Sequence, residues 1–432
     1  MIRTAFLLCL ALAPLQTRAD DLLTIYRQVI DSDPTLKAAE AGYQAVLLGK
    51  DKAIAILLPT ANLSANTSKN QQVSSISLKP GKLNYNNTGY TLSISQPVFH
   101  YDAFVQNRQA TLSIQKSAAE LATAQQDLII RAAENYFNLL SAQASLEFAR
   151  SEKKATAKQL EQAQKRFEVG LIAITDVYEA KSAYDLVVAS EITARNQLDS
   201  AGEALSEITG IINNPLAKLD TNIPLQKPDP ANMNEWTKIA LKQNLQLKAT
   251  KAAVEISKEN ISLQRSGHYP TLDIVASRNK SDTGGDFGRN STTDSVTLQL
   301  NVPLFQGGLV NAQTKEAAYL YSQAKHNLDK QLRATMRQTR DAYRGVISGI
   351  SQVRALKQAT ISTKSALETT QAGFDVGTRN IVDVLLAQRN LFRSKRDYDQ
   401  ALHQYVLNVL RLKFSAGTLS PDDLKYFNAW LK

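Results

Sequence analysis

The sequence contains a glycine-centred stretch that occurs twice. Residues 166–177 read RFEVGLIAITDV and residues 373–384 read GFDVGTRNIVDV, so that Gly170 is matched by Gly377, 207 positions later. Glycine readily adopts the left-handed backbone conformation in which many helices end. Each stretch therefore predicts the turn of a helical hairpin, with a long helix before the glycine and a second helix after it.

The repetition extends over almost the whole sequence. Pro97 in QPVF (96–99) is matched by Pro303 in VPLF (302–305), and Pro59 is matched by Pro270. A period of 206 to 211 residues indicates duplication of half the molecule rather than a short solenoid repeat. The chain divides into a first repeat at 20–219, a proline-rich linker at 220–231, a second repeat at 232–416 and a C-terminal tail at 417–432.

The N-terminus has the pattern of a secretory signal peptide at residues 1–19. Arg3 precedes an apolar stretch at 5–15, and small residues then form a cleavage site. We predict cleavage after Ala19. The single cysteine, Cys9, lies inside this signal. The mature chain is therefore predicted to have no thiol for a disulfide, a metal or catalysis.

Each repeat contains two segments of alternating apolar and polar residues, which is typical of a strand with one apolar and one polar face. The segments begin at Thr60, Tyr90, Thr271 and Val296, and polar loops are predicted at 69–88 and 280–293. A length of about 9–11 residues suits a tilted transmembrane strand, although the pattern alone also fits a strand of a soluble sandwich. Four strands cannot close a barrel, and lipid does not tolerate an open edge. The sheet is therefore predicted to oligomerise, with three chains giving about twelve strands.

The rest of the chain has helical patterns of two lengths. Long helices are predicted at 102–167 and 309–374, each of some 65 residues and nearly 100 Å long at about 1.5 Å per residue. Half-length helices are predicted at 22–57, 175–209, 234–267 and 380–415. A heptad spacing of mostly apolar residues occurs at Leu139, Leu146, Lys153 and Leu160. The helices are therefore predicted to pack as coiled coils.

Composition and motifs argue against several functions. The 50 basic and 40 acidic residues give a net charge of +10, but the basic residues are scattered among acidic ones, so nucleic-acid binding is not predicted. The histidines have no metal-ligand spacing, and no nucleophile elbow, phosphate loop or dinucleotide fingerprint occurs. The four histidines are His100, His268, His326 and His403. We predict no enzymatic activity, no cofactor and no metal.

Three classes of exported protein have long coiled-coil helices: an outer-membrane channel, a periplasmic coiled-coil adaptor, and an adhesin or structural coiled coil. Four amphipathic strands placed symmetrically in two copies favour the channel, because neither of the other classes needs them. The adaptor is the main alternative.

The two hairpin stretches, together with GHYPTL (267–272), PLFQGG (303–308) and GTL (417–419), closely resemble the TolC family of outer-membrane efflux and secretion channels. The resemblance covers essentially the whole mature chain. It implies a homotrimer in the outer membrane of a Gram-negative bacterium, with a 12-stranded β-barrel and a 12-helix periplasmic α-barrel. The linker and the tail would belong to an equatorial belt. It also implies docking through a periplasmic adaptor onto an inner-membrane pump of the RND, MFS or ABC class, for export of drugs or proteins.

The resemblance also assigns roles to residues at the two hairpin turns. Asp383 would be the acidic residue at the periplasmic entrance, and Leu386 stands where some relatives have a second acid. Phe374 replaces a tyrosine that bonds across the closed tip in relatives. A gate latch is predicted from Arg379 to Thr175 and Asp176. From the sequence alone, Thr175 and Asn380 are also predicted to be helix N-caps, and Asp176 and Asp383 fit acids of a first helical turn.

Overall fold

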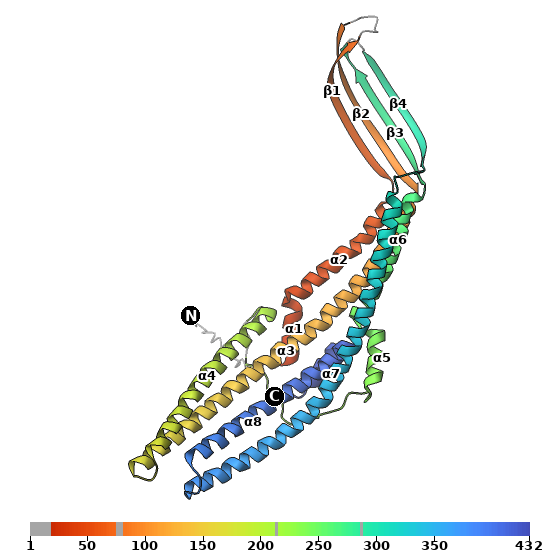
Figure 1. Ribbon diagram of the computed structural model, residues 1–432. Coiled ribbons are helices and arrows are strands. Elements are labelled where there is room, and N and C mark those ends of the chain that lie inside the picture. The colour runs from red at the N-terminus through yellow and green to blue at the C-terminus, as the bar shows by residue number, and fades with distance from the viewer. Residues whose placement is uncertain (1–18, 75–80, 212–214, 286–287) are drawn as a thin grey trace, which may run out of the picture. The chain divides into compact units, whose positions relative to one another are not determined.

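The computed structural model of the chain describes residues 19–74, 81–211, 215–285 and 288–432 (Figure 1). Residues 1–18 of the predicted signal peptide, including Cys9, lie outside the described residues. The chain forms two compact units. The hairpin unit comprises residues up to 37, 124–244 and 335–432, and the sheet unit comprises 38–123 and 245–334.

Long helices account for most of both units. The hairpin unit contains α1 (Leu22–Ser32), α4 (Ile174–Thr209), α5 (Met233–Gln243), α8 (Ile381–Ala416) and α9 (Pro421–Asn428). The sheet unit contains most of α2 (Pro34–Ala55), α6 (Leu245–Arg265) and the short 3-10 helix η1 (Ser266–His268). The helices α3 (Tyr101–Glu168) and α7 (Leu309–Asp375) contribute to both units. The two predicted long helices are confirmed to within one residue at each end.

The predicted helix at 22–57 is wrong, because the chain breaks at Asp33 between α1 and α2. Pro34 follows directly, and a proline disfavours the helical conformation of the residue before it and donates no backbone hydrogen bond. The Asp33 carboxylate accepts a bond from the backbone N–H of Leu36 (2.7 Å), which starts α2. The helix predicted at 234–267 is likewise broken, at Asn244, whose side chain donates to the backbone carbonyl of Ser415 (2.9 Å).

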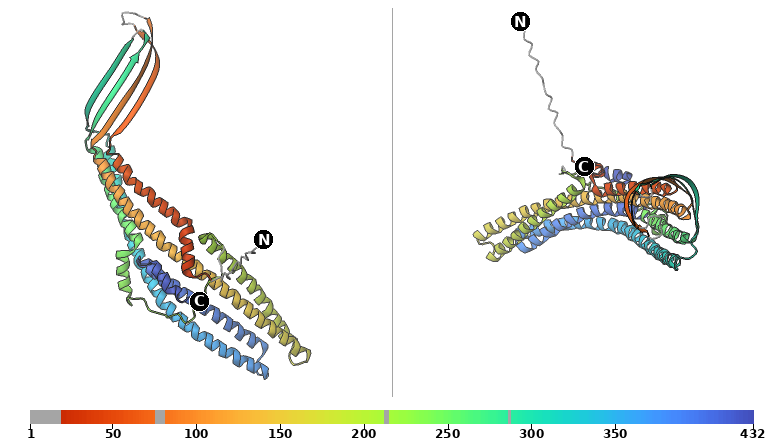
Figure 2. Two further views of the ribbon diagram at one scale, coloured as in Figure 1. Left: turned by 180° about the vertical axis from the view of Figure 1, so that it is seen from behind. Right: turned by 90° about the horizontal axis from the view of Figure 1, so that it is seen from above.

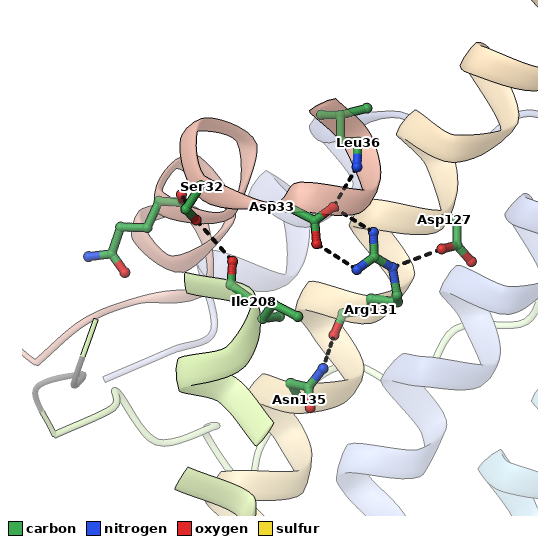
Figure 3. Close-up of polar contacts among 8 residues, drawn as sticks. Ser32, Asp33, Leu36, Asp127, Arg131, Asn135 and Ile208 are labelled. Atoms are coloured by element: carbon green, nitrogen blue, oxygen red, sulfur yellow. Dashed lines mark hydrogen bonds and ion pairs between the residues drawn. The ribbon is translucent and has the colours of Figure 1, made fainter. Parts of the chain in front are cut away.

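The break at Asp33 is fixed by a buried ion pair (Figure 3). The guanidinium of Arg131 on α3 donates to both carboxylate oxygens of Asp33, at 2.7 and 3.1 Å, and to Asp127 at 2.8 Å. The side chain of Asp33 is only 1% exposed. Hydrogen bonding from Arg131 holds the pKa of the Asp33 carboxyl below its ordinary value, so Asp33 stays ionised and paired.

The linker and the tail fold together within the hairpin unit. Leu219 forms an isolated antiparallel bridge with Leu431, and the hydroxyl of Tyr405 on α8 bonds to the backbone of Gln226 in both directions. The tail contains α9, which begins in a capping box formed by Ser420 and Asp423. The side chain of Asn428 at its end bonds to α1. These contacts make the two segments one structural region.

Four antiparallel strands form a single curved sheet in the order β1-β2-β3-β4 (Figure 2). They are β1 (Thr60–Ser74), β2 (Gly81–Phe99), β3 (Thr271–Thr283) and β4 (Arg289–Asn301). All four predicted segments are confirmed, but the strands are longer than predicted. The predicted loops at 69–88 and 280–293 are wrong over most of their described length. Backbone hydrogen bonds continue through them, while the apolar alternation that marks a strand in the sequence stops earlier.

The strand register sorts the side chains onto two faces. Odd residues of β1 share a face with even residues of β2, β3 and β4, and in the half of the sheet nearer the helices this face is apolar. We call it the apolar face. It carries Ala61, Leu63, Leu92, Ile94, Ile274, Ala276, Val296, Leu298 and Leu300. The opposite, polar face carries Asn62, Ser64, Ser93, Ser95, Ser277, Ser295 and Thr297.

The apolar face is open to its surroundings within one chain. Leu63, Val296 and Leu298 are 71%, 80% and 66% exposed. A water-soluble sheet would cover such a face with a helix or a second sheet. Helices of this unit instead pair with each other, as in the ion pair of Arg108 on α3 with Glu259 on α6 (3.0 Å).

Candidate functional site

The first hairpin turn joins α3 to α4. Gly170 has a φ of 73°, in the left-handed region, and its N–H donates to the carbonyl of Phe167 (2.9 Å). The N–H of Leu171 donates to the carbonyl of Arg166 (2.9 Å). No atom lies within 4 Å of where a Cβ on Gly170 would be. Backbone conformation rather than space therefore requires glycine here.

The second hairpin turn joins α7 to α8 and is built in the same way. Gly377 has a φ of 81°, and its N–H donates to the carbonyl of Phe374 (3.2 Å). Asn380 caps α8: its side chain accepts from the N–H of Asp383 (2.8 Å), and the Asp383 carboxylate accepts from the N–H of Asn380 (3.5 Å). The predicted N-cap at Asn380 is confirmed.

The start of α4 differs from the start of α8. Ala173 occupies the N-cap position and makes no side-chain cap bond, and α4 begins at Ile174. The predicted N-cap at Thr175 is therefore wrong. Thr175 and Asp176 lie inside the first turn of α4, where an acidic side chain is favoured by the helix dipole.

One arginine joins the two hairpins. Arg166, near the end of α3, donates from Nη1 to the carbonyl of Phe374 (3.4 Å) and from Nη2 to the Asp375 carboxylate (3.2 Å). Its guanidinium carbon also lies 4.3 Å from the centroid of the Phe374 ring. About two turns before Arg166 on α3, Gln159 donates to the side chain of Gln371 (3.1 Å). Within a single chain these contacts hold the α3–α4 hairpin to the α7–α8 hairpin.

Reasoning from the sequence did not assign a role to Arg166. The sequence contains a signal for this role. Gly373 occupies the position of the second repeat that is equivalent to Arg166, so only the first repeat carries a cation there. Gly373 is also a close-approach position: an added Cβ would lie 2.8 Å from Cγ of Arg379. The two hairpins are thus alike in their turns and different in the side chains that meet between them.

Phe374 is the buried member of this contact. Its ring is 4% exposed and packs with Ile381 and Val384, at the start of α8, in a small apolar cluster. Leu386, by contrast, is 45% exposed. Phe374 and Leu386 both depart from the family pattern, but they lie in different surroundings. Phe374 packs inside the hairpin, and Leu386 lies on its surface.

Arg379 and Asp383 lie together at the start of α8. Nη1 of Arg379 is 3.8 Å from the Asp383 carboxylate, and both side chains are exposed. Among the described residues of one chain, no hydrogen bond or ion pair connects Arg379 with Thr175 or Asp176. The predicted latch between the hairpins stays a prediction, and such a contact would have to form with another chain or another state.

A groove of 790 Å³ lies further along the hairpins, several helical turns from Gly170 and Gly377, and is lined by α3, α4 and α8. Arg389, Arg393 and Arg396 line it from α8, and Glu152 lines it from α3. Burial raises the pKa of the Glu152 carboxyl, and the positive charges of Arg396 and Arg389 partly oppose this rise.

Among the helices of the described residues, none is long and apolar enough to cross a membrane. No group of three or more histidine, cysteine, aspartate or glutamate side chains within the same residues could hold a metal ion.

The two repeats match a known protein family. The family model described as "Outer membrane efflux protein" matches residues 25–211 and 236–418, which is one block in each repeat. The chain belongs to the outer membrane efflux protein family. It is an efflux and secretion channel of the Gram-negative outer membrane, and this membership removes the periplasmic-adaptor and adhesin alternatives.

Several named proteins are similar to the chain over most of their length. The chain is 36% identical to the outer membrane protein TolC of Vibrio cholerae, covering 96% of this chain and 94% of that protein. It is 35% identical to TolC of Escherichia coli, and the match covers 95% of this chain and 85% of that protein. It is 30% identical to the alkaline protease secretion protein AprF of Pseudomonas aeruginosa, covering 94% and 86%.

Solved structures share the fold at low sequence identity. The outer membrane protein VceC of Vibrio cholerae matches with a TM-score of 0.78 at 19% identity, covering 92% of this chain and 96% of that chain. The CmeC outer membrane channel of Campylobacter jejuni matches with a TM-score of 0.80 at 15% identity, covering 95% and 90%. The fold of the chain is therefore shared with these solved structures over almost its whole length.

Proposed function

We propose that three copies of this chain close a twelve-stranded β-barrel in the outer membrane and continue it as a twelve-helix α-barrel in the periplasm. The observation that carries the proposal is the four-stranded sheet with an exposed apolar face, a polar face and two unpaired edges, β1 and β4. An edge in lipid leaves backbone groups without partners, so it must pair with another chain. In a closed barrel the apolar face meets lipid and the polar face lines the water-filled pore.

A matched pair of substitutions tests which face meets lipid. Leu298 and Thr297 are neighbours on β4 and lie on opposite faces. An arginine on the lipid face near the membrane midplane costs about 2–4 kcal/mol. Leu298→Arg should therefore lower the yield of inserted trimer, measured as the heat-modifiable band on a gel, while Thr297→Arg should insert normally. Normal insertion of Leu298→Arg together with failure of Thr297→Arg would reverse the assignment of the faces.

The hairpin turns are proposed as the periplasmic entrance and its gate. Threefold symmetry would bring three Asp383 carboxylates and three Arg166–Phe374 contacts to one end of the tunnel. Clustered carboxylates favour cations at such an entrance. Arg166 would hold the two hairpins of each chain together in the closed state, and Arg379 would reach Thr175 and Asp176 of a neighbouring chain. The region formed by the linker and the tail would be the equatorial belt.

The proposed channel works with partners that supply energy and select cargo. A periplasmic adaptor would connect the entrance to an inner-membrane transporter of the RND, MFS or ABC class. Relatives named as the alkaline protease secretion protein AprF and the proteases secretion protein PrtF support a secretion role, and a relative named as the outer membrane efflux protein BepC supports an efflux role. Outer-membrane lipid would be the remaining partner, and no nucleic acid, cofactor or catalytic residue takes part.

A further inference from the structure

The charged residues of the sheet are distributed unevenly between its two faces. Lys69, Lys82 and Lys280 are the lysines of the four described strands, and the register places all three on the apolar face. They lie in the half of the sheet away from the helices, beyond the apolar rows. Arg289 is the one basic strand residue of the described sheet that lies on the polar face. Cations therefore accumulate on the apolar face.

The other cation on the apolar face is already neutralised. Arg278 makes a two-pronged ion pair with Asp294 across β3 and β4, at 2.7 and 2.8 Å. By contrast, the three lysines make no hydrogen bond or ion pair with any residue that the structure describes, and each is exposed. Asp282 is the one unpaired acid among the described strand residues on the same face, so the face has a surplus of free positive charge.

The order of the rows along the sheet resembles the order of layers in a membrane. The Ala276 row is apolar, the next row holds Leu63, Leu92 and the Arg278–Asp294 pair, and the row after that holds Tyr90 beside Lys280. Tyrosine is enriched where lipid meets water, and lysine lies where headgroups carry negative charge. The row of Tyr90 and Lys280 therefore marks the outer boundary of the lipid.

The remaining lysines lie further out than a thin layer of headgroups. Lys69 pairs in register with Asn86, and Lys82 lies on β2 eight positions from Tyr90. Eight residues of strand span about 27 Å, or about 20 Å along the membrane normal for a strand tilted by some 40°. The strand ends away from the helices face the cell exterior if the helices lie in the periplasm. The lysines therefore extend through the polar layer that lies outside the acyl chains of the outer leaflet.

We infer that this outward lysine surface, formed by Lys69, Lys82 and Lys280, binds the anionic glycolipid of the outer leaflet through its phosphate and acidic-sugar groups. The inference rests on the proposed barrel, which turns this face toward lipid. A glycolipid with negative groups at several heights above its acyl chains matches lysines at several heights on the strands. The acyl chains would lie against the apolar rows, and Lys280 would meet the phosphates nearest to them.

Retention of lipopolysaccharide by the purified trimer tests the inference. The variant carries Lys69→Gln, Lys82→Gln and Lys280→Gln, and Arg289→Gln on the polar face is the matched control. Each lysine near an anionic surface contributes an affinity factor of about five. We expect the triple variant to retain much less lipopolysaccharide than wild type in mild detergent, and wild-type retention to fall as salt rises. The control should retain the wild-type amount.

Two further measurements separate the possible outcomes. Inorganic phosphate should displace no more glycolipid than sodium chloride at the same ionic strength, because phosphate lacks the acyl chains. Greater displacement by phosphate would show that the surface is only an anion site. Trimer formation and single-channel conductance report on the proposed channel itself. If the triple variant forms conducting trimers that keep wild-type lipopolysaccharide, the inference is overturned and the channel stands. If wild type forms no trimer, the proposed barrel fails instead.

Discussion

The guanidinium carbon of Arg166 lies 4.3 Å from the ring centroid of Phe374, and the same guanidinium bonds to the Phe374 carbonyl and the Asp375 carboxylate. These two residues are 208 positions apart in the sequence and join the two hairpin turns of one chain. Phe374 has no hydroxyl to bond across the tip. The aromatic face and the carbonyl of this residue instead receive the cation.

The first prediction concerns this contact. A cation over an aromatic ring and a partly exposed ion pair together contribute about 1–2 kcal/mol. Arg166→Gln should therefore favour the open entrance, raise single-channel conductance and sensitise cells to vancomycin. Lys165→Gln is the control, because Lys165 is an exposed neighbour paired with Glu161 within α3. Equal conductance and resistance in the two variants, at equal trimer level, would remove Arg166 from the gate.

The second prediction concerns the latch of Arg379. Within one chain its partner is Asp383, and an exposed pair of this kind contributes little to stability. If Arg379 also bonds to Thr175 and Asp176 of a neighbour, then Arg379→Ser should raise conductance and vancomycin sensitivity. If Arg379 only stabilises the start of α8, Arg379→Ser should leave conductance and vancomycin sensitivity unchanged. Combining Arg379→Ser with Arg166→Gln should widen the entrance further, since the two contacts connect different pairs of hairpins.

The third prediction concerns ion selectivity. Asp383 supplies one acidic ring in the proposed trimer, and Leu386 supplies no second ring. Asp383→Asn should reduce the preference for cations in planar-bilayer recordings, because the ring loses its charge. Asp383 also accepts from the N–H of Asn380, and asparagine can keep that role in the cap. An unchanged reversal potential in Asp383→Asn would exclude Asp383 as the selectivity residue.

The fourth prediction concerns pH. Burial raises the pKa of Asp399 on α8 to about 6, above its ordinary value of 3.8. The folded chain thus favours the neutral acid, and ionisation removes stability as pH rises from about 4 to 6. Asp399→Asn should stabilise the protein at pH 7.5, by about 1–3 kcal/mol per chain, and have little effect at pH 4. Thermal melts of wild type and variant at both pH values measure this. A variant less stable than wild type at pH 7.5 would contradict the assignment.

Local signals in the sequence were sufficient for much of the fold. The turns at Gly170 and Gly377 and the cap at Asn380 depend on neighbours within a few residues, and all three are found in the structure. The long helices follow from a repeated apolar pattern in the same way. The break at Asp33 also has a local signal, because Pro34 indicates the end of α1, although the prediction of one helix at 22–57 does not include this signal.

Other features depend on parts of the chain that meet only after folding. The halves of β1 and β2 that lie away from the helices are mostly polar on both faces. They form strands because they pair with each other, and apolar alternation does not mark them in the sequence. The contact of Arg166 with Phe374 requires the two hairpins to lie together. The residue type predicts a capping threonine at 175, yet the turn places Ala173 at the cap, because the start of α4 is set by the backbone after Gly170.

Cysteine crosslinking between sheet edges tests the central claim, that three chains close one barrel through β1 and β4. The predicted mature chain has no cysteine, so Asn62→Cys on β1 can be combined in turn with Ser295→Cys, Thr297→Cys or Gln299→Cys on β4, all on the polar face. After oxidation in membranes, the pair in register should give covalent dimers and trimers on a denaturing gel, with no larger species, and either cysteine alone should give none. A ladder that continues beyond three chains, or no crosslink in any pairing, would contradict the closed trimer.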